Sequence, residues 1–297
     1  MEKRRRNNTR GKRGKPTWKT LLLTIVLVLA SLAWEYWEDY QSRQPIAGQL
    51  ELHMIDVGQG DSFLLRSGNE TMLIDASIRD AGKTISAYLQ DLGIQKLDRL
   101  LITHDHSDHK GGLKQVMKDI DTDVLMLYDG GDRESGYQLA GEMAGSSSCD
   151  IAFVEAGQQF TLGDAVIKVI FPTTGYETDD KNDASVVLLV ECAGKRILLT
   201  GDSTAAAELR YYESLPTVDV LKVGHHGSGG STSKDLLDQI QPKLALISCG
   251  ADNDYGHPHK RVVNDLKEIG AQIYRTDEQG HVVLTLQDGE LTVKTQR

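Results

Sequence analysis

The segment Thr103–Gly112 reads Thr-His-Asp-His-Ser-Asp-His-Lys-Gly-Gly, with three histidines and two aspartates in the six positions 104–109. It follows the apolar run Leu100–Ile102, which predicts a strand, and leads into a predicted helix over Lys110–Ile120. Loops that join a strand to a helix are a common place for functional side chains. Because neutral imidazoles and carboxylates suit Zn²⁺, Mn²⁺ or iron, the segment predicts a metal site.

The spacing within this segment divides the candidate ligands into two sets. His104 and His106 alternate with Asp105, so an extended backbone places both imidazoles on one side. Asp108 and His109 come after the turn and are positioned to reach a second metal. The segment therefore predicts ligands for two ions rather than one.

Two ions need further ligands, including one that bridges them, and other predicted strands end in suitable residues. An apolar run is followed by Thr-Gly-Asp, which ends at Asp202. Another is followed by Gly-His-His-Gly-Ser, which contains His225 and His226. Each pattern alone is weak, since an aspartate after a glycine is usually part of a turn. Three apolar strands that all end in ligand-type residues predict a shared site.

The remaining pattern alternates strands and helices and predicts two sheets packed face to face with helices outside. A loop rich in glycine and serine is expected over 130–148. The expected helices cover 81–92, 110–120, 204–213, 233–240 and 259–269. The expected strands cover 49–57, 62–66, 71–75, 97–103, 123–128, 151–155, 165–171, 185–192, 195–200, 218–223, 244–248, 272–274, 281–287 and 290–294.

Charge is distributed unevenly along the 297 residues. Residues 1–19 hold nine of the 33 Lys and Arg side chains but one of the 43 acidic ones. The rest of the chain therefore has 24 basic and 42 acidic side chains, a net charge of −18. A domain this acidic is not suited to broad binding of a phosphate backbone, so a nucleic-acid substrate would require metals or a local basic strip.

The first 49 residues are expected to lie outside the globular part. A basic cytoplasmic tail over 1–19 precedes a predicted transmembrane anchor over 20–37, with tryptophans at both of its ends, and a polar linker follows over 38–49. The basic run places the N-terminus inside, so we expect an extracytoplasmic domain at the cell membrane. A cleaved signal peptide, with secretion of the domain, is the alternative.

Three cysteines, at positions 149, 192 and 249, are widely separated. They form neither a disulfide framework nor a thiolate zinc site, and we expect small buried side chains. A single disulfide between Cys149 and Cys249 stays open as an alternative.

Together, the histidine segment, the strand-end Asp75 and the motifs at Asp202 and His225 resemble the metallo-β-lactamase superfamily. Three further stretches narrow the resemblance to the hydrolase domain of ComEC-type competence proteins and to phosphorylcholine esterases: Asp-Val-Gly-Gln-Gly-Asp at 56–61, Leu-Lys-Val-Gly-His-His-Gly-Ser at 221–228 and Tyr-Gly-His-Pro-His at 255–259. The resemblance covers roughly residues 50–286. It implies an αββα sandwich over 50–297, preceded by the transmembrane helix, with two divalent ions (Zn²⁺ or Mn²⁺) as cofactors.

The resemblance also implies individual roles. His104 and His106 would hold the first metal, and Asp202 would bridge. Asp108 and His109 would hold the second metal, with either His225 or His226. We favour His225 because it directly follows Gly224 at the strand end.

Other residues would support the reaction. Asp75 would fix the tautomer of a ligand imidazole. His257, and less surely His226, would protonate the leaving oxygen or bind a non-bridging one, and Asp108 would join them in catalysis. Three residues in a glycine-rich loop would shape the pocket: Asp56, Gln59 and Asp61. The superfamily usually has a further histidine before the bridging aspartate; this chain has none there, and Asn182, Asp183 or water would substitute.

Three functions are therefore weighed. The first is a phosphodiesterase that acts on DNA or another phosphodiester through a hydroxide held by two metals. The second is a hydrolase of phosphorylcholine or another small ester. The third is a non-catalytic module, stabilised by metal, in a DNA-uptake or envelope assembly. The expected partners are the substrate and the membrane, and the sequence identifies no protein partner.

Overall fold

A computed structural model describes residues 18–42, 49–128 and 149–297. The chain divides into two units, Met1–Gln44 and Pro45–Arg297. The predicted basic tail up to residue 17, residues 43–48 of the predicted linker and the expected loop over 130–148 lie outside the described residues.

The first unit contains one described helix, α1 (Trp18–Ser42). None of the helices in the described parts of the chain combines the length and apolar character that crossing a membrane requires. The anchor over 20–37 stays a prediction.

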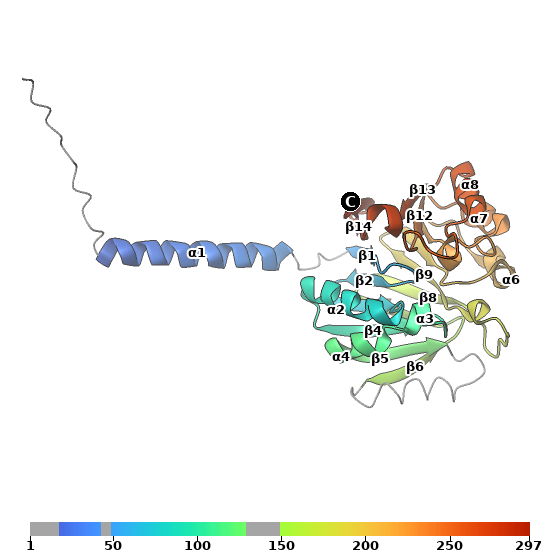
Figure 1. Cartoon of the computed structure of the whole chain (residues 1–297), viewed down its shortest axis with the longest axis horizontal. Helices are drawn as coiled ribbons and strands as arrows, with labels where there is room; N and C mark the ends of the chain where they lie inside the picture. Colours follow the sequence, from blue (N-terminus) through green and yellow to red (C-terminus); the bar gives the residue numbers. More distant parts are fainter. Residues whose placement is uncertain (1–17, 43–48, 129–148) are drawn as a thin grey trace, which may run out of the picture. The chain divides into compact units, whose positions relative to one another are not determined.

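Two β-sheets form the second unit (Figure 1). The order of the first sheet is β15-β14-β1-β2-β3-β4-β5-β6, and the order of the second is β13-β12-β11-β10-β9-β8-β7. The strands of the first sheet are β1 (Leu50–Met54), β2 (Phe63–Ser67), β3 (Glu70–Ile74), β4 (Lys96–Ile102), β5 (Asp121–Tyr128), β6 (Asp150–Val154), β14 (Val282–Gln287) and β15 (Glu290–Thr295). Those of the second are β7 (Gln159–Leu162), β8 (Ala165–Phe171), β9 (Val187–Cys192), β10 (Lys195–Leu199), β11 (Val220–Lys222), β12 (Leu244–Ile247) and β13 (Gln272–Arg275).

Short helices connect the strands. The described α-helices of this unit are α2 (Gly82–Asp91), α3 (Ser107–Lys110), α4 (Leu113–Asp119), α6 (Ala205–Glu208), α7 (Lys234–Ile240), α8 (Lys260–Glu268) and α9 (Thr276–Gln279). The 3₁₀ turns are η1 (Arg79–Ala81), η2 (Lys181–Ala184), η3 (Tyr212–Ser214) and η4 (Gly224–Gly227).

Three apolar clusters show how the layers pack. One cluster joins the facing surfaces of both sheets, with Phe63 from β2 and Leu199 from β10 among its members. A second lies between the first sheet and helices α2 and α4, and includes Leu89. A third joins the second sheet to α7 and α8, and includes Leu236 and Val262. The predicted sandwich with helices on both outer faces is therefore confirmed.

All three cysteines are free thiols. Cys192 and Cys249 are buried and Cys149 is partly buried, so the thiols behave as small packed side chains. The alternative disulfide between Cys149 and Cys249 does not form in this structure.

Candidate metal centre

The candidate ligands follow strands from both sheets. In the first sheet, β3 and β4 run parallel and are followed by Asp75 and by the segment that begins at Thr103. In the second sheet, β10 and β11 run parallel and lead to Asp202 and to the turn η4. Parallel strands deliver the residues after their carboxyl ends to the same sheet edge, and the packed sheets bring the two edges together.

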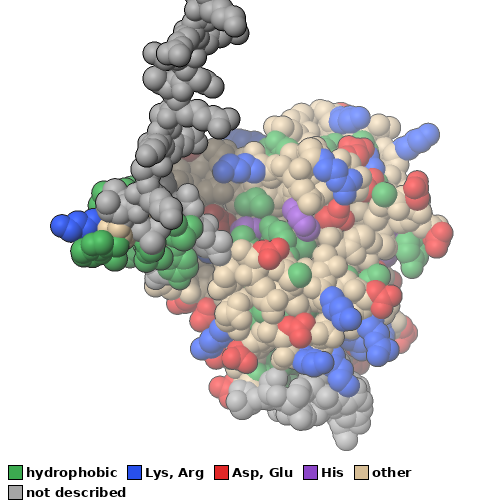
Figure 2. All heavy atoms as spheres, turned by 60° about the vertical axis from the view of Figure 1, so that its left-hand side comes forward, with side chains coloured by type: hydrophobic (Ala, Val, Ile, Leu, Met, Phe, Trp, Pro, Cys, Tyr) green, Lys and Arg blue, Asp and Glu red, His purple; other side chains and the backbone are tan. Residues whose placement is uncertain are grey.

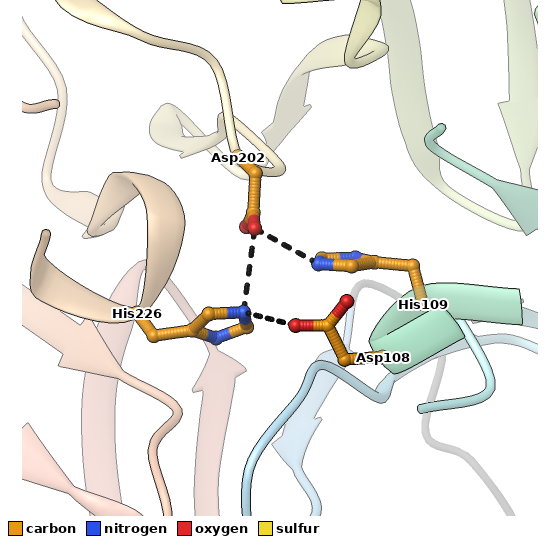
Figure 3. Close-up of side chains that lie close together, drawn as sticks. All are labelled: Asp108, His109, Asp202 and His226. Atoms are coloured by element: carbon orange, nitrogen blue, oxygen red, sulfur yellow. Dashed lines mark ion pairs between the residues drawn. The ribbon is translucent and has the colours of Figure 1, made fainter. Parts of the chain in front are cut away.

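Four side chains from these strand ends converge: Asp108, His109, Asp202 and His226 (Figure 3). The Nε2 atom of His109 lies 3.1 Å from Oδ2 of Asp202. The Nε2 atom of His226 lies 3.3 Å from the same oxygen and 3.4 Å from Oδ2 of Asp108. One ligand atom from each residue lies within 4.8 Å of all the others, so a single ion can be shared by the four.

The hydrogen bonds at the outer ring nitrogens fit a metal. His109 Nδ1 lies 2.7 Å from Oδ2 of Asp75, and His226 Nδ1 lies 3.0 Å from the carbonyl oxygen of Ser248. In the neutral form of each ring, a proton on Nδ1 leaves the lone pair on Nε2. Both Nε2 atoms are buried and make no hydrogen bond among the described residues. Two buried lone pairs beside the carboxylates of Asp108 and Asp202 form the donor set that a divalent transition metal requires.

The electrostatics of this cluster favour a cation. Burial alone would lower the pKa of His109, but the carboxylates of Asp202 and Asp75 outweigh it and raise that pKa to about 10. The pKa of His226 also rises well above its ordinary value, because Asp202 and Asp61 outweigh its burial. Carboxylates that hold protons on buried imidazoles attract positive charge, and a bound metal would displace those protons.

A second set of candidate ligands lies next to the first. Nε2 of His104 is 3.0 Å from Nδ1 of His106, and the same Nδ1 is 3.0 Å from Oδ1 of Asn182. Asn182 is in η2, the segment where the sequence lacks the usual histidine. Burial, followed by the charge of His109, lowers the pKa of His104 well below its ordinary value and leaves the ring neutral. This set has two imidazoles and an amide oxygen, so it is poorer in charge than the first.

Two buried aspartates lie beside the Nδ1 atoms of the ligand imidazoles. Asp75 accepts hydrogen bonds from the backbone nitrogen and the hydroxyl of Thr103, at 2.8 and 2.7 Å, and thereby aims its carboxylate at His109. Asp61 lies 3.2 Å from Nδ1 of His226 and 2.5 Å from Nζ of Lys222. Asp75 therefore orients the imidazole of His109, which is the position expected of it, whereas Asp61 places a negative charge beside the ring of His226.

A cavity of about 280 Å³ opens onto the cluster. Asp108, Asp202 and His226 line it together with residues from other loops: Gln59, His106, Ser107, Asn182, His225, Tyr255 and His257. The ring of His257 lies 6.3 Å from the ring of His226, between centroids. Burial and the charge of His226 lower the pKa of His257 to about 4. The cavity thus joins both sets of candidate ligands to solvent.

Comparison with known proteins identifies the family of this site. The family model described as "Metallo-beta-lactamase superfamily" matches residues 55–251, which include all the candidate ligands. The chain belongs to this superfamily.

Relatives within the superfamily include competence proteins. The chain is 31% identical over 257 residues to ComE operon protein 3 of Bacillus subtilis, and the match covers 80% of this chain and 33% of the relative. It is 32% identical over 246 residues to competence protein ComA of Neisseria gonorrhoeae, covering 82% of this chain and 33% of the relative. The chain thus spans about a third of the length of these relatives.

A solved structure supports the fold. The metallo-beta-lactamase fold protein YhfI of Bacillus subtilis aligns with a TM-score of 0.51 at 12% identity, covering 76% of this chain and 95% of that structure. At this identity the likeness concerns the fold.

The structure separates the two adjacent histidines. Nε2 of His225 lies 3.8 Å from Oδ2 of Asp202, and its side chain is 28% exposed, whereas the His226 side chain is 1% exposed and lies within the cluster. Both residues have positive φ, 49° and 54°, and this tight left-handed turn directs the second imidazole inward. The distances therefore favour His226 as the ligand, against the preference for His225.

The three residues of the glycine-rich loop that were expected to shape the pocket lie in different places. Gln59 lines the cavity and Asp61 contacts His226, but Asp56 does not line the cavity. The carboxylate of Asp56 accepts a hydrogen bond from Arg297 at 3.0 Å and one from the backbone of Gly58 at 3.3 Å. Asp56 therefore ties the turn to the C-terminus rather than lining the candidate site.

The sequence motifs indicate no role for Lys222, although this buried lysine contacts the cluster. Its Nζ atom lies 3.4 Å from Oδ1 of Asp202 and donates to the carbonyl oxygen of Gly201. A signal was present in the sequence: a lone charge within the apolar run 220–223, in a strand buried on both faces, must find a partner inside.

Proposed function

We propose that this protein is a metal-dependent phosphodiesterase that acts on DNA or another phosphodiester. The observation that carries the proposal is the pair of buried Nε2 atoms of His109 and His226. They make no hydrogen bond among the described residues and face the carboxylates of Asp108 and Asp202, which line the cavity. Relatives named for competence favour DNA among the phosphodiesters.

The chain's own residues would divide into two metal sites. Asp108, His109 and His226 would hold one ion, and Asp202 would be shared. His104 and His106 would hold the other, with the amide oxygen of Asn182 in place of the usual histidine. Two such ions, when bound, would supply an activated water and neutralise charge on a phosphoryl group.

Other residues would orient the reaction. Asp75 holds His109 in one tautomer, and this fixes the direction of its lone pair. His257 lines the cavity beside His225, with ring centroids 5.6 Å apart, and would contact an oxygen of the substrate. The buried Lys222 would keep Asp202 aimed at the ions.

A small-ester hydrolase is the second candidate. The net charge of −18 outside residues 1–19 disfavours a long polyanion and suits a cationic group such as choline. A non-catalytic module is the third, because the set around His104 has fewer charged ligands than the set around Asp202.

The test uses the full-length chain loaded with Mn²⁺ or Zn²⁺. We expect cleavage of a single-stranded oligodeoxynucleotide and of bis(p-nitrophenyl) phosphate, with little action on p-nitrophenyl phosphorylcholine. Asp202→Asn should lower the rate by at least about 100-fold, because it removes a shared ligand, while the exposed Leu209→Ala should cleave at the wild-type rate.

Two other results decide against DNA as the substrate. Cleavage of p-nitrophenyl phosphorylcholine alone, a phosphodiester that carries choline, would support the second candidate. Absence of hydrolysis from a metal-loaded, folded protein would support the third.

A further inference from the structure

An exposed aromatic side chain lies at the mouth of the cavity. Tyr255 is 64% exposed and lines the cavity with Asp202 and His226. Among the described residues after position 48, the other exposed large hydrophobic side chains are Ile78 and Leu209, and neither lines this cavity. Scattered exposed apolar residues are ordinary, but an aromatic ring at the entrance to a polar cavity is positioned to contact a ligand.

Tyr255 begins a series of rings that leads to the candidate ligands. Its ring is 5.6 Å from the ring of His257, between centroids, with an angle of 22° between the planes. The ring of His257 is in turn 6.3 Å from that of His226, with an angle of 30°. A flat group stacked on Tyr255 would continue this series outward, with its attached phosphodiester directed along the cavity.

The loop that carries Tyr255 is braced internally. The side chain of Asn253 donates to the carbonyl oxygens of Gly250 and His257, at 2.9 and 2.7 Å, and accepts from the backbone nitrogen of His257 at 2.9 Å. The side chain of Gln59 accepts from the backbone of Gly250 at 3.2 Å. A ring on a braced loop is ordered before a ligand arrives, which reduces the entropy lost on binding.

The basic side chains near the candidate site offer little attraction for a phosphate backbone. Near the candidate ligands, Lys110 and Lys181 are both paired with the carboxylate of Asp105. Figure 2 shows one face of the molecule, on which acidic and basic side chains are interspersed. A nucleic acid would therefore have to be held by the ions and by contacts to its bases, and stacking on aromatic rings is the contact that every base can make.

We propose that Tyr255 forms a nucleobase-stacking subsite for a nucleotide whose phosphodiester lies in the cavity. This inference rests on the proposed phosphodiesterase function and narrows its substrate to single-stranded nucleic acid or to a small nucleotide. The cavity of about 280 Å³ suits one nucleotide rather than a length of duplex. Because stacking is tolerant of base identity, the subsite would discriminate between a base and no base, not among the four bases.

The test measures binding separately from hydrolysis. The full-length chain with Mn²⁺ is titrated into a fluorescein-labelled tetrathymidylate with phosphorothioate linkages, and into the same backbone with abasic sugars, and anisotropy is recorded. Tyr255→Ala should weaken binding of the base-bearing probe by about 10-fold and leave the abasic probe unchanged. Tyr255→Phe should keep wild-type affinity for both probes, and the control Leu209→Ala should do the same.

Specific outcomes overturn the subsite. Equal affinity of the wild type for the two probes, or equal loss on both in Tyr255→Ala, would remove the base from the interaction. Displacement of the probe by phosphocholine but not by thymidine monophosphate, dependent on Tyr255, would assign the ring to a choline group instead. Since Tyr255 is exposed, circular dichroism should show that Tyr255→Ala keeps the wild-type fold.

The two proposals fail separately. A chain that prefers the base-bearing probe through Tyr255 but cleaves no phosphodiester would retain the subsite and refute the phosphodiesterase. A chain that cleaves phosphodiesters without any preference for a base would retain the phosphodiesterase and refute the subsite.

Discussion

The ammonium nitrogen of Lys222 lies 2.5 Å from Oδ2 of Asp61, and both side chains are almost completely buried. The same ammonium lies 3.4 Å from Oδ1 of Asp202, so one buried positive charge faces two buried carboxylates. Buried charges are costly unless they are paired, and removal of one partner leaves the other uncompensated. This pair therefore links the stability of the domain to the geometry of the candidate metal centre.

The first prediction concerns that pair. Lys222→Met should lower the free energy of unfolding by about 3–5 kcal/mol, because it leaves the buried carboxylates of Asp61 and Asp202 without their cation. Urea denaturation of the metal-free protein measures the change. The exposed Lys243→Met is the matched control, and its loss should stay below about 1 kcal/mol. If Lys222→Met unfolds at the wild-type urea concentration, the pair has no such role.

The second prediction concerns Asp75. Asp75→Asn should weaken metal binding by about 10- to 100-fold, because an amide holds the Nδ1 proton of His109 less firmly than a carboxylate. Competition with a chromophoric chelator measures the affinity. Asp98→Asn is a suitable control, since Asp98 accepts from the backbone of Thr71 at 2.8 Å and does not line the cavity. Equal metal affinity in the wild type and Asp75→Asn would contradict the role given to Asp75.

The third prediction concerns pH and a site on β1. A hydrogen bond from His53, together with the nearby Arg66, lowers the pKa of Glu51 below its ordinary value of 4.5 despite partial burial. A lowered carboxyl pKa stabilises the fold above the ordinary value, and the gain is lost as the pH falls through the lowered pKa. Glu51→Gln should therefore cost about 1 kcal/mol at pH 7 and nothing at a pH below the lowered value. Urea denaturation across this range checks it, and a constant difference at all pH values would contradict it.

Much of the fold was predictable because hydrophobic periodicity reports directly on burial. The expected strand over 97–103 corresponds to β4, and the sandwich follows from the alternation of strands and helices. The helix expected over 110–120 corresponds to α4, and a separate short helix, α3, ends at Lys110, with Gly111 and Gly112 between the two. A side chain at Gly112 would overlap the carbonyl oxygen of Ala76, so close approach of two backbones, not propensity, sets this break.

The direction of individual side chains was harder to predict. Consecutive left-handed residues decide which of His225 and His226 faces Asp202, and such a turn leaves no periodic signal. The buried partner of Lys222 is Asp61, which lies 161 positions away in sequence and in a loop of the other sheet. Asp56 and Asp61 occupy similar places in one motif, yet the first binds Arg297 and the second contacts His226.

Metal content of the full-length protein tests the central claim most directly. After loading with Mn²⁺ or Zn²⁺ and dialysis, elemental analysis should find about two ions per chain in the wild type and in His225→Asn, and about one in a folded His226→Asn. A wild-type chain that retains no ion, or a His226→Asn variant that retains as many as the wild type, would contradict the account.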